Sequence, residues 1–166
     1  IATATCTKAA STVKLLGVGH SAKRKRTTRV QAQRTAALTS RIPKIQALRK
    51  AGANPAQYVQ AAGVPMALYG VESTGIANSP LKRLIGDVAK AVAPPSAGKN
   101  PRMVMHAIAP SCTSVDPTFA AHTMPIKAWA VAWWDGWAQH DVMKTSFLTA
   151  KTRLAAAKRS MWNLVD

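Results

Sequence analysis

The first 71 residues of this chain contain twelve Lys and Arg side chains and no Asp or Glu. All six acids follow, at Glu72, Asp87, Asp116, Asp135, Asp141 and Asp166. The formal net charge of the whole chain is +17. A small folded body with this much unopposed charge repels itself unless a polyanion lies close to it. The charge distribution therefore favours nucleic acid as the partner.

The chain has 166 residues, which is enough for one domain with a hydrophobic core or for two small helical lobes. Cys6 and Cys112 are too few and too far apart for a disulfide framework, so we expect two free, buried thiols. The longest apolar stretch, residues 128–134, is far shorter than the ~20 residues of a membrane-spanning helix. The start has no secretory pattern, and Ile1 in place of Met indicates a fragment. We expect a protein that is neither secreted nor transmembrane.

The N-terminal half predicts a hairpin followed by a long helix. Residues 13–20 form a short apolar run broken by two glycines, which favours a strand or a tight hairpin. Over residues 27–50, apolar side chains recur every three or four positions and predict one buried helical stripe, namely Val30, Ala37, Leu38, Ile42, Ile45 and Leu48. Pro43 should kink or split this helix, and Gly52 should end it. Four arginines lie largely off the stripe: Arg26, Arg29, Arg34 and Arg41.

Two further helices are indicated by their start signals. Asn54-Pro55 predicts a helix over residues 55–67, disturbed at Gly63 and Pro65. Ser79-Pro80 predicts another over residues 81–92, which Pro94-Pro95 ends. Residues 93–101 have the composition of an exposed linker.

The C-terminal part is also predicted to be helical. Residues 102–109 are ambiguous, Asp116-Pro117 starts a Trp-rich helix, and residues 142–165 favour a last helix by propensity. The predicted fold is mainly α, with a short N-terminal β-hairpin or strand, a helical bundle and a second, Trp-containing helical lobe. Its parts are a hairpin segment (1–21), a basic helical domain (22–92), a linker (93–101) and a helical extension (102–166).

The densest cationic run is Lys23-Arg24-Lys25-Arg26, followed by Arg29. Such runs bind phosphates or nuclear import receptors, because several cations act together. A solvated patch without a partner is the alternative interpretation. The cluster of Trp129, Trp133, Trp134 and Trp137 could stack on bases, but at helical spacing we favour a core role.

The residue types that catalysis or metal binding requires do not occur at the necessary spacings. The four His and two Cys residues contain no closely spaced pairs of metal ligands, so we predict no metal site. The six acids are scattered singly, which leaves no carboxylate pair for catalysis. Gly17 and Gly19 lack the rest of a dinucleotide or phosphate-loop motif. We therefore expect no catalytic centre and no small-molecule substrate in this chain.

Three stretches, in order, resemble the region just after the polymerase palm in reverse transcriptases of non-LTR (LINE-type) retrotransposons. The first, residues 13–18, is similar to the Leu-Gly turn of the hairpin that grips the primer strand, with Leu16 and Gly17 at the turn and Lys14 beside it. The second is the basic helix from Arg24 to Leu48. The third, residues 64–72, looks like the thumb's Leu-Tyr-Gly-x-Glu segment and contains Tyr69, Gly70 and Glu72.

This resemblance covers about residues 10–92 and implies a thumb-like helical bundle that clamps a template–primer duplex of RNA or RNA–DNA hybrid. The family's double-aspartate motif lies upstream of the hairpin and has no match here, so the fragment would be non-catalytic. The parent enzyme would use Mg²⁺, and the upstream palm of the polyprotein would be a partner. The implied contacts to nucleic acid are Lys14, Gly17, Lys23, Arg24, Lys25, Arg26, Arg29, Arg34 and Arg41.

Two alternatives remain open at this stage. The chain could be a stand-alone basic RNA- or DNA-binding helical protein, or a decayed remnant of an element with no function. A retroelement polymerase with a Lys-Arg cluster would be expected in the nucleus. The sequence does not specify an oligomeric state or a preferred nucleotide sequence.

Overall fold

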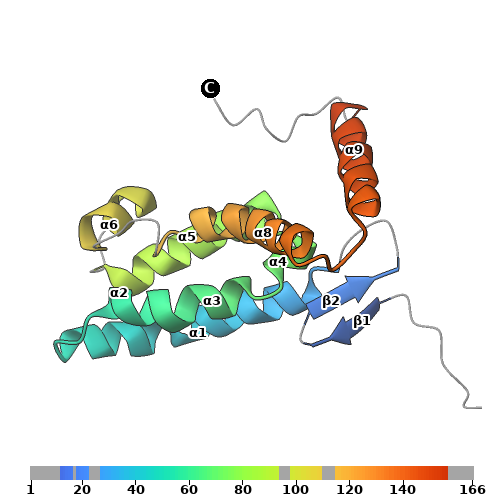
Figure 1. Ribbon diagram of the computed structural model, residues 1–166. Coiled ribbons are helices and arrows are strands. Elements are labelled where there is room, and N and C mark those ends of the chain that lie inside the picture. Colours follow the sequence, from blue (N-terminus) through green and yellow to red (C-terminus); the bar gives the residue numbers. More distant parts are fainter. Residues whose placement is uncertain (1–11, 17, 23–26, 94–97, 110–114, 157–166) are drawn as a thin grey trace, which may run out of the picture. The chain divides into compact units, whose positions relative to one another are not determined.

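The structure, a computed structural model, describes residues 12–16, 18–22, 27–93, 98–109 and 115–156. The elements are β1 (Thr12–Leu15), β2 (Val18–Ser21), α1 (Arg29–Lys50), α2 (Pro55–Tyr58), the π-helix η1 (Val59–Gly63), α3 (Val64–Leu68), α4 (Val71–Thr74), α5 (Asn78–Val92), α6 (Pro101–Ile108), α8 (Pro117–Trp134) and α9 (His140–Ala156). The predicted fold class is confirmed, because a short hairpin is followed by helices, one of them rich in Trp (Figure 1).

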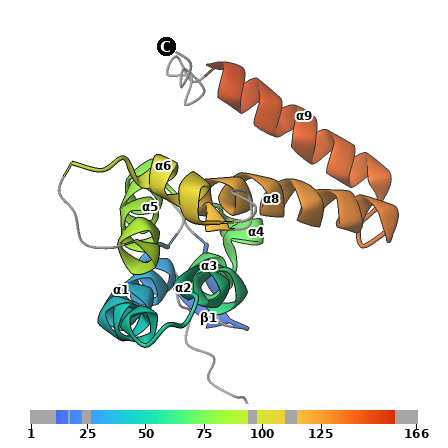
Figure 2. The same cartoon turned by 90° about the vertical axis from the view of Figure 1, so that its left-hand side faces the viewer.

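The chain forms two compact units, residues 1–126 and 127–166. The first unit has a core that begins with the predicted stripe of α1, where Leu38, Ile42 and Ile45 are buried. This stripe packs against α3 and α5, which lie alongside α1 in both views (Figures 1 and 2). Burying one such side chain contributes about 1.5–3 kcal/mol. The apolar period of α1 therefore positions the rest of the unit.

The boundary between the units differs from the predicted linker at residues 93–101. Met105 of α6, Val115 and Ala121 of α8 belong to the same core cluster as the buried residues of α5. The described residues 98–109 and 115–126 therefore belong to the first unit, and the division falls within α8. The apolar side chains that cause this, Met105, Val115 and Ala121, follow the stretch whose composition alone suggested a boundary.

The two strands form an antiparallel hairpin with Leu15 opposite Val18. The turn between them includes Leu16, whose φ of 47° is the left-handed value that L side chains seldom adopt. Gly17 lies outside the described residues. All four residues of β1 are exposed, whereas Gly19 of β2 is buried. Of the two strands, β2 is the one that packs against α1 and α4.

The predicted helix signals agree with the structure at several ends. Gly52 has a φ of 89°, and Ala53 N–H donates to the Leu48 carbonyl at 3.0 Å, which ends α1 as predicted. Asn54 Oδ1 accepts from Ala56 N–H at 3.0 Å, and Asp116 Oδ1 accepts from Thr118 N–H at 2.8 Å. Both residues are N-caps.

Other signals are modified by the packing. Pro43 does not split α1, which continues as one helix over Arg29–Lys50. The predicted disturbance near Gly63 is a π-helical segment, Val59–Gly63, between α2 and α3. The predicted start of α5 is too late, because the helix begins at Asn78. Its N-cap residue is Ala77, which has no side chain that could cap the helix by a hydrogen bond.

Downstream, the ambiguous residues after the linker form a helix. Asn100 caps α6 by accepting from Arg102 N–H at 2.9 Å. The last predicted helix is observed as α9, and residues 157–166 lie outside the described part. Across the described ranges, no helix combines the length and the apolar character needed to cross a membrane.

Gly70 connects α3 to α4 in a conformation that only glycine adopts easily, with φ at 87°. A Cβ atom at this position would lie 2.8 Å from Cγ2 of Val18 in the hairpin. The left-handed φ costs an L residue about 1–2 kcal/mol, and the contact with Val18 adds to that cost. Gly70 therefore lets β2 pack closely on the start of α4.

We expect Gly70→Ala to lower the free energy of unfolding by more than the about 1–2 kcal/mol that the φ alone costs. The matched control is Gly86→Ala in the middle of α5, where a Cβ would have no neighbour within 4 Å. This control should raise the stability by about 0.5–1 kcal/mol, the usual gain from replacing a helical glycine. Urea denaturation measures both. Equal stability of the two variants would contradict the close approach at Gly70.

Candidate nucleic-acid interface

The turn of the hairpin is tied to the end of α3 by Tyr69. The Tyr69 hydroxyl donates a hydrogen bond to the carbonyl oxygen of Leu16 at 3.2 Å, across 53 residues of sequence. The carbonyl that receives this bond belongs to the residue with positive φ. Tyr69 therefore holds the turn in the conformation that exposes the Leu16 side chain, of which 85% is accessible.

Arg34 of α1 fixes Tyr69 in turn. The Arg34 guanidinium carbon lies 4.4 Å from the centroid of the Tyr69 ring, and Nη1 donates to the Tyr69 carbonyl. A guanidinium over an aromatic face is a favourable cation–π contact. Because one side chain grips both the ring and the backbone of Tyr69, α1 sets the position of the hairpin turn through it.

The residues after Tyr69 complete this arrangement. Gly70 N–H donates to Glu72 Oε2 at 3.0 Å, and Gly70 approaches Val18 closely. We call Leu16, Val18, Arg34, Tyr69 and Gly70 the hairpin junction. Figure 1 shows the hairpin beside the first turns of α1 and beside α4. The structure thus brings together residues from the three stretches on which the sequence resemblance rests.

The predicted cations do not share one solvent-facing side of α1. Arg34 and Arg41 are seven residues apart and both face α3, since Arg41 Nη1 donates to Met66 Sδ at 3.0 Å. Arg29 precedes Arg34 by five residues and lies about 140° around the helix at 100° per residue. Arg29, Arg34 and Arg41, which the resemblance implies as contacts to nucleic acid, therefore do not lie on a single face of α1. Arg34 and Arg41 instead make contacts within the chain.

The other predicted contacts divide into exposed and undescribed residues. Lys14 on β1 and Arg29 at the start of α1 are exposed. Gly17 and the run Lys23, Arg24, Lys25 and Arg26 lie outside the described residues. Lys14 and Arg29 are thus the predicted cations that the structure places at the surface of the hairpin and of the adjoining end of α1.

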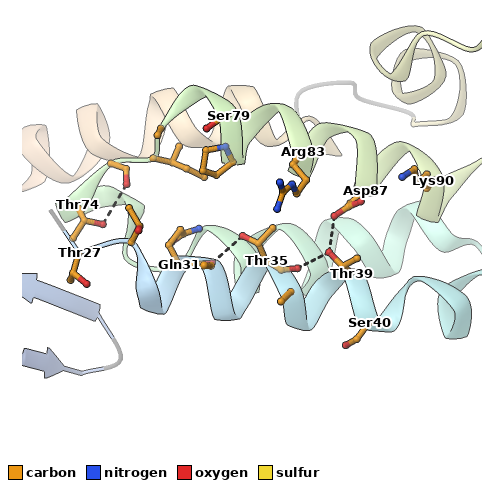
Figure 3. Close-up of a pocket in the computed structure, with 17 residues that line it drawn as sticks. Thr27, Gln31, Thr35, Thr39, Ser40, Thr74, Ser79, Arg83, Asp87 and Lys90 are labelled. Carbon is orange, nitrogen blue, oxygen red and sulfur yellow. Dashed lines mark hydrogen bonds between the residues drawn. The ribbon is translucent and has the colours of Figure 1, made fainter. Parts of the chain in front are cut away.

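A groove between α1 and α5 was not predicted from the sequence. It has a volume of about 970 Å³, and seven of its seventeen lining residues are Ser or Thr. Its floor holds Asp87 of α5, which is only 5% exposed, and Asp87 Oδ2 accepts from the Thr39 hydroxyl at 2.7 Å. Figure 3 shows this carboxylate directed across the groove toward Thr39. A sequence signal that could have indicated the groove is the row of hydroxyl side chains beside the apolar stripe of α1.

The hydroxyl groups of this row are engaged within the protein. Thr35 Oγ1 donates to the Gln31 carbonyl at 3.0 Å, and Thr39 Oγ1 also lies 3.0 Å from the Thr35 carbonyl (Figure 3). A buried carboxylate requires such donors, because its desolvation is costly. The groove therefore serves first as a polar seam that joins α1 to α5.

Among the residues that the structure describes, His, Cys, Asp and Glu form no group of three or more that could hold a metal ion. Cys6 and Cys112 lie outside those residues. His140 is engaged with an aromatic ring, since it stacks on Trp133 with centroids 4.4 Å apart.

The tryptophan cluster does not form a core in the described structure. Trp134 is 89% exposed and Trp137 is 70% exposed, while Trp129 is 45% exposed. The interpretation that favoured a core role was therefore wrong for these three residues. Helical spacing correctly placed Trp129 and Trp134 in a helix, α8, whereas Trp137 lies in the turn after it. Exposure depends on which other elements pack there, and that is a long-range property.

Comparison of the chain with protein-family models, with curated proteins and with solved structures found no match. The resemblance to reverse transcriptases thus stays a prediction. The function is argued below from the residues and contacts of the chain itself.

We expect Tyr69→Phe to loosen the hairpin, because it removes the hydroxyl that bonds the Leu16 carbonyl and keeps the ring under Arg34. Amide exchange in β1 and β2 should become about two- to tenfold faster, as expected for one lost hydrogen bond. Tyr58→Phe on α2 replaces the only other tyrosine of the chain and is the control. If both variants exchange alike in the hairpin, Tyr69 does not hold the turn.

We expect Thr39→Val to destabilise the first unit by about 1–3 kcal/mol, because it leaves the buried Asp87 carboxylate without its hydroxyl donor. Thr39→Ser keeps a hydroxyl at the same place and should retain most of the stability. Thermal and urea unfolding provide the measurement. A valine variant as stable as the serine variant would show that the Thr39–Asp87 bond contributes nothing.

Proposed function

We propose that this chain is a non-catalytic, nucleic-acid-binding part of an RNA-directed DNA polymerase, which holds a template–primer duplex by its sugar–phosphate backbone. The observation that carries the proposal is the hairpin junction. There the turn at Leu16, the helix residue Arg34 and Tyr69 meet, although they are far apart in the sequence. These are the same stretches that together resemble the hairpin and thumb of non-LTR reverse transcriptases.

Leu16 supplies a side chain suited to contact with the duplex. Its positive φ costs about 1–3 kcal/mol, and such conformations tend to occur at functional sites. Its carbonyl is held by Tyr69, so the exposed side chain has a fixed place. An apolar side chain at a rigid turn can pack on a sugar or at the end of a base stack, where it aligns the strand end.

Electrostatic attraction supplies the affinity. Lys14 and Arg29 are exposed, and the net charge of +17 attracts a polyanion irrespective of its sequence. Contacts to phosphates fix the register and orientation of a nucleic acid without selecting a base sequence. This mode of binding is what a polymerase that copies any template requires of its thumb.

The remaining parts of the proposal follow from the resemblance. Catalysis and Mg²⁺ binding would belong to an upstream palm, which would be the protein partner of this chain. RNA or an RNA–DNA hybrid would be its nucleic-acid partner. The cluster Lys23-Arg24-Lys25-Arg26 is suited to nuclear import, so the proposed location is the nucleus.

We expect the double variant Lys14→Glu, Arg29→Glu to weaken binding of an RNA–DNA hybrid and to flatten its dependence on salt. The slope of log K against log salt should fall by about one unit for each lost phosphate contact. Fluorescence anisotropy across a salt series gives both quantities. Lys50→Glu is the matched control, because it reverses a cation at the opposite end of α1, about 30 Å from Arg29 at 1.5 Å per residue.

An unchanged slope in the double variant, or an equal loss in Lys50→Glu, would contradict the proposed interface. A full-chain protein that binds duplex DNA as tightly as the hybrid would favour a stand-alone basic DNA- or RNA-binding protein instead. The same measurements on wild-type protein therefore separate the two functions.

A further inference from the structure

The second unit carries a partly exposed group of aromatic rings where α9 meets the end of α8. The Trp129 ring lies 5.5 Å from Trp133 and 6.0 Å from Phe147, measured between centroids. Trp129 is 45% exposed and Phe147 is 56% exposed. We call Trp129, Trp133 and Phe147 the aromatic platform. Its rings contact one another and still present surface to solvent.

The platform is held by contacts that do not depend on a ligand. His140 stacks on Trp133 with ring planes 4° apart, and His140 Nε2 lies 3.1 Å from the Trp133 carbonyl oxygen. Trp137 N–H donates to the Ala132 carbonyl at 3.0 Å and closes the turn between the helices. Rings that are fixed in advance lose little conformational freedom when a flat ligand stacks on them.

Cations flank the platform on α9. Lys144 and Lys151 are exposed and lie three residues before and four residues after Phe147. At 100° per residue both fall within about 60° of Phe147 around the helix. Of the three acids of this unit, Asp135 lies in the turn between the helices, Asp141 lies in the first turn of α9, and Asp166 is outside the described residues. Lys144 and Lys151 are therefore the charged residues nearest to Phe147 along α9.

We propose that the aromatic platform, with Lys144 and Lys151, binds single-stranded nucleic acid. Bases would stack on Trp129 and Phe147 while the lysines contact the phosphates. This combination of aromatic surface and flanking cations tolerates any base sequence, because every base has a flat face. Duplex bases are already stacked on one another, so the site selects unpaired strands. The proposal is independent of the hairpin junction, which lies in the other unit.

Charge is the reason to favour this occupant over an apolar protein partner. An apolar partner would gain nothing from two lysines beside the rings, whereas phosphates spaced along a strand do. The net charge of the whole chain also concentrates polyanions around it. A protein partner, including a second copy of this chain, is an alternative outcome of the experiment below.

The test uses the full chain and a short single-stranded oligothymidylate, with anisotropy and tryptophan quenching as readouts. We expect Trp129→Leu combined with Phe147→Leu to weaken binding at least tenfold, since about 1.4 kcal/mol corresponds to a factor of ten and each base stack exceeds or approaches that value. Trp129→Phe keeps a ring and should bind nearly as wild type. Trp134→Leu, at the most exposed tryptophan, is the matched control and should have little effect.

The charge arm uses Lys144→Glu with Lys151→Glu, both exposed positions whose reversal leaves the ring contacts intact. It should lower the salt slope for the single strand by about 0.7 for each lost contact. If the leucine variants fail to fold, this charge-reversal variant alone tests whether the platform binds single strands. An unchanged slope with unchanged affinity would overturn the proposal.

Two further outcomes would also overturn it. Competition by duplex as effective as by single strand would remove the claimed selectivity. Platform substitutions that change the sedimentation of the protein but leave oligonucleotide binding intact would identify a protein–protein surface. Lys14→Glu with Arg29→Glu should leave single-strand binding in place, so failure of the proposed duplex interface is distinguishable from failure of this site.

Discussion

The first unit depends on one constraint, which is that α1 must pack against α3, α5 and the hairpin strand β2 at once. Its apolar stripe, centred on Leu38 and Ile45, supplies the burial that holds α3 and α5. Burial alone is not directional, so it does not fix how far one helix slides along another. The polar side chains on either flank of the stripe provide that specificity. Arg34 reaches the end of α3 on one flank, and Thr39 reaches α5 on the other.

These flanking contacts also explain how a chain with few acids keeps its cations compatible with a compact fold. Arg34 contacts the Tyr69 carbonyl and the face of the Tyr69 ring, neither of which carries a net charge. Arg41 similarly contacts a thioether. Such contacts retain the positive charge instead of cancelling it, and the long-range field of the unit stays positive. The structural use of arginine and the attraction for a polyanion are therefore compatible.

The sequence predicted the local structure well because caps and apolar periods act over a few residues. Asn54, Asp116 and Gly52 mark helix ends that the structure confirms. Properties that depend on distant residues were not accessible in the same way. Nothing in the local pattern around Arg34 indicates that Tyr69 will capture it, and exposure of Trp134 depends on the absence of a covering element among those described. The sequence analysis did not predict the contacts among Leu16, Arg34 and Tyr69, and the Thr39–Asp87 seam had no sequence motif.

The two proposed sites use different physical interactions, and this difference has a consequence for how the chain would bind a nucleic acid with both paired and unpaired parts. Phosphate contacts near Lys14 and Arg29 weaken steeply with salt, because binding releases condensed counterions. The aromatic platform combines stacking on Trp129 and Phe147, which involves no net charge, with phosphate contacts of Lys144 and Lys151, and each such contact has a smaller salt slope on a single strand, about 0.7, than on a duplex, about 0.9. Raising the ionic strength should therefore shift the balance of affinity from duplex regions toward single strands. A protein that held both through lysines alone would lose the two affinities together.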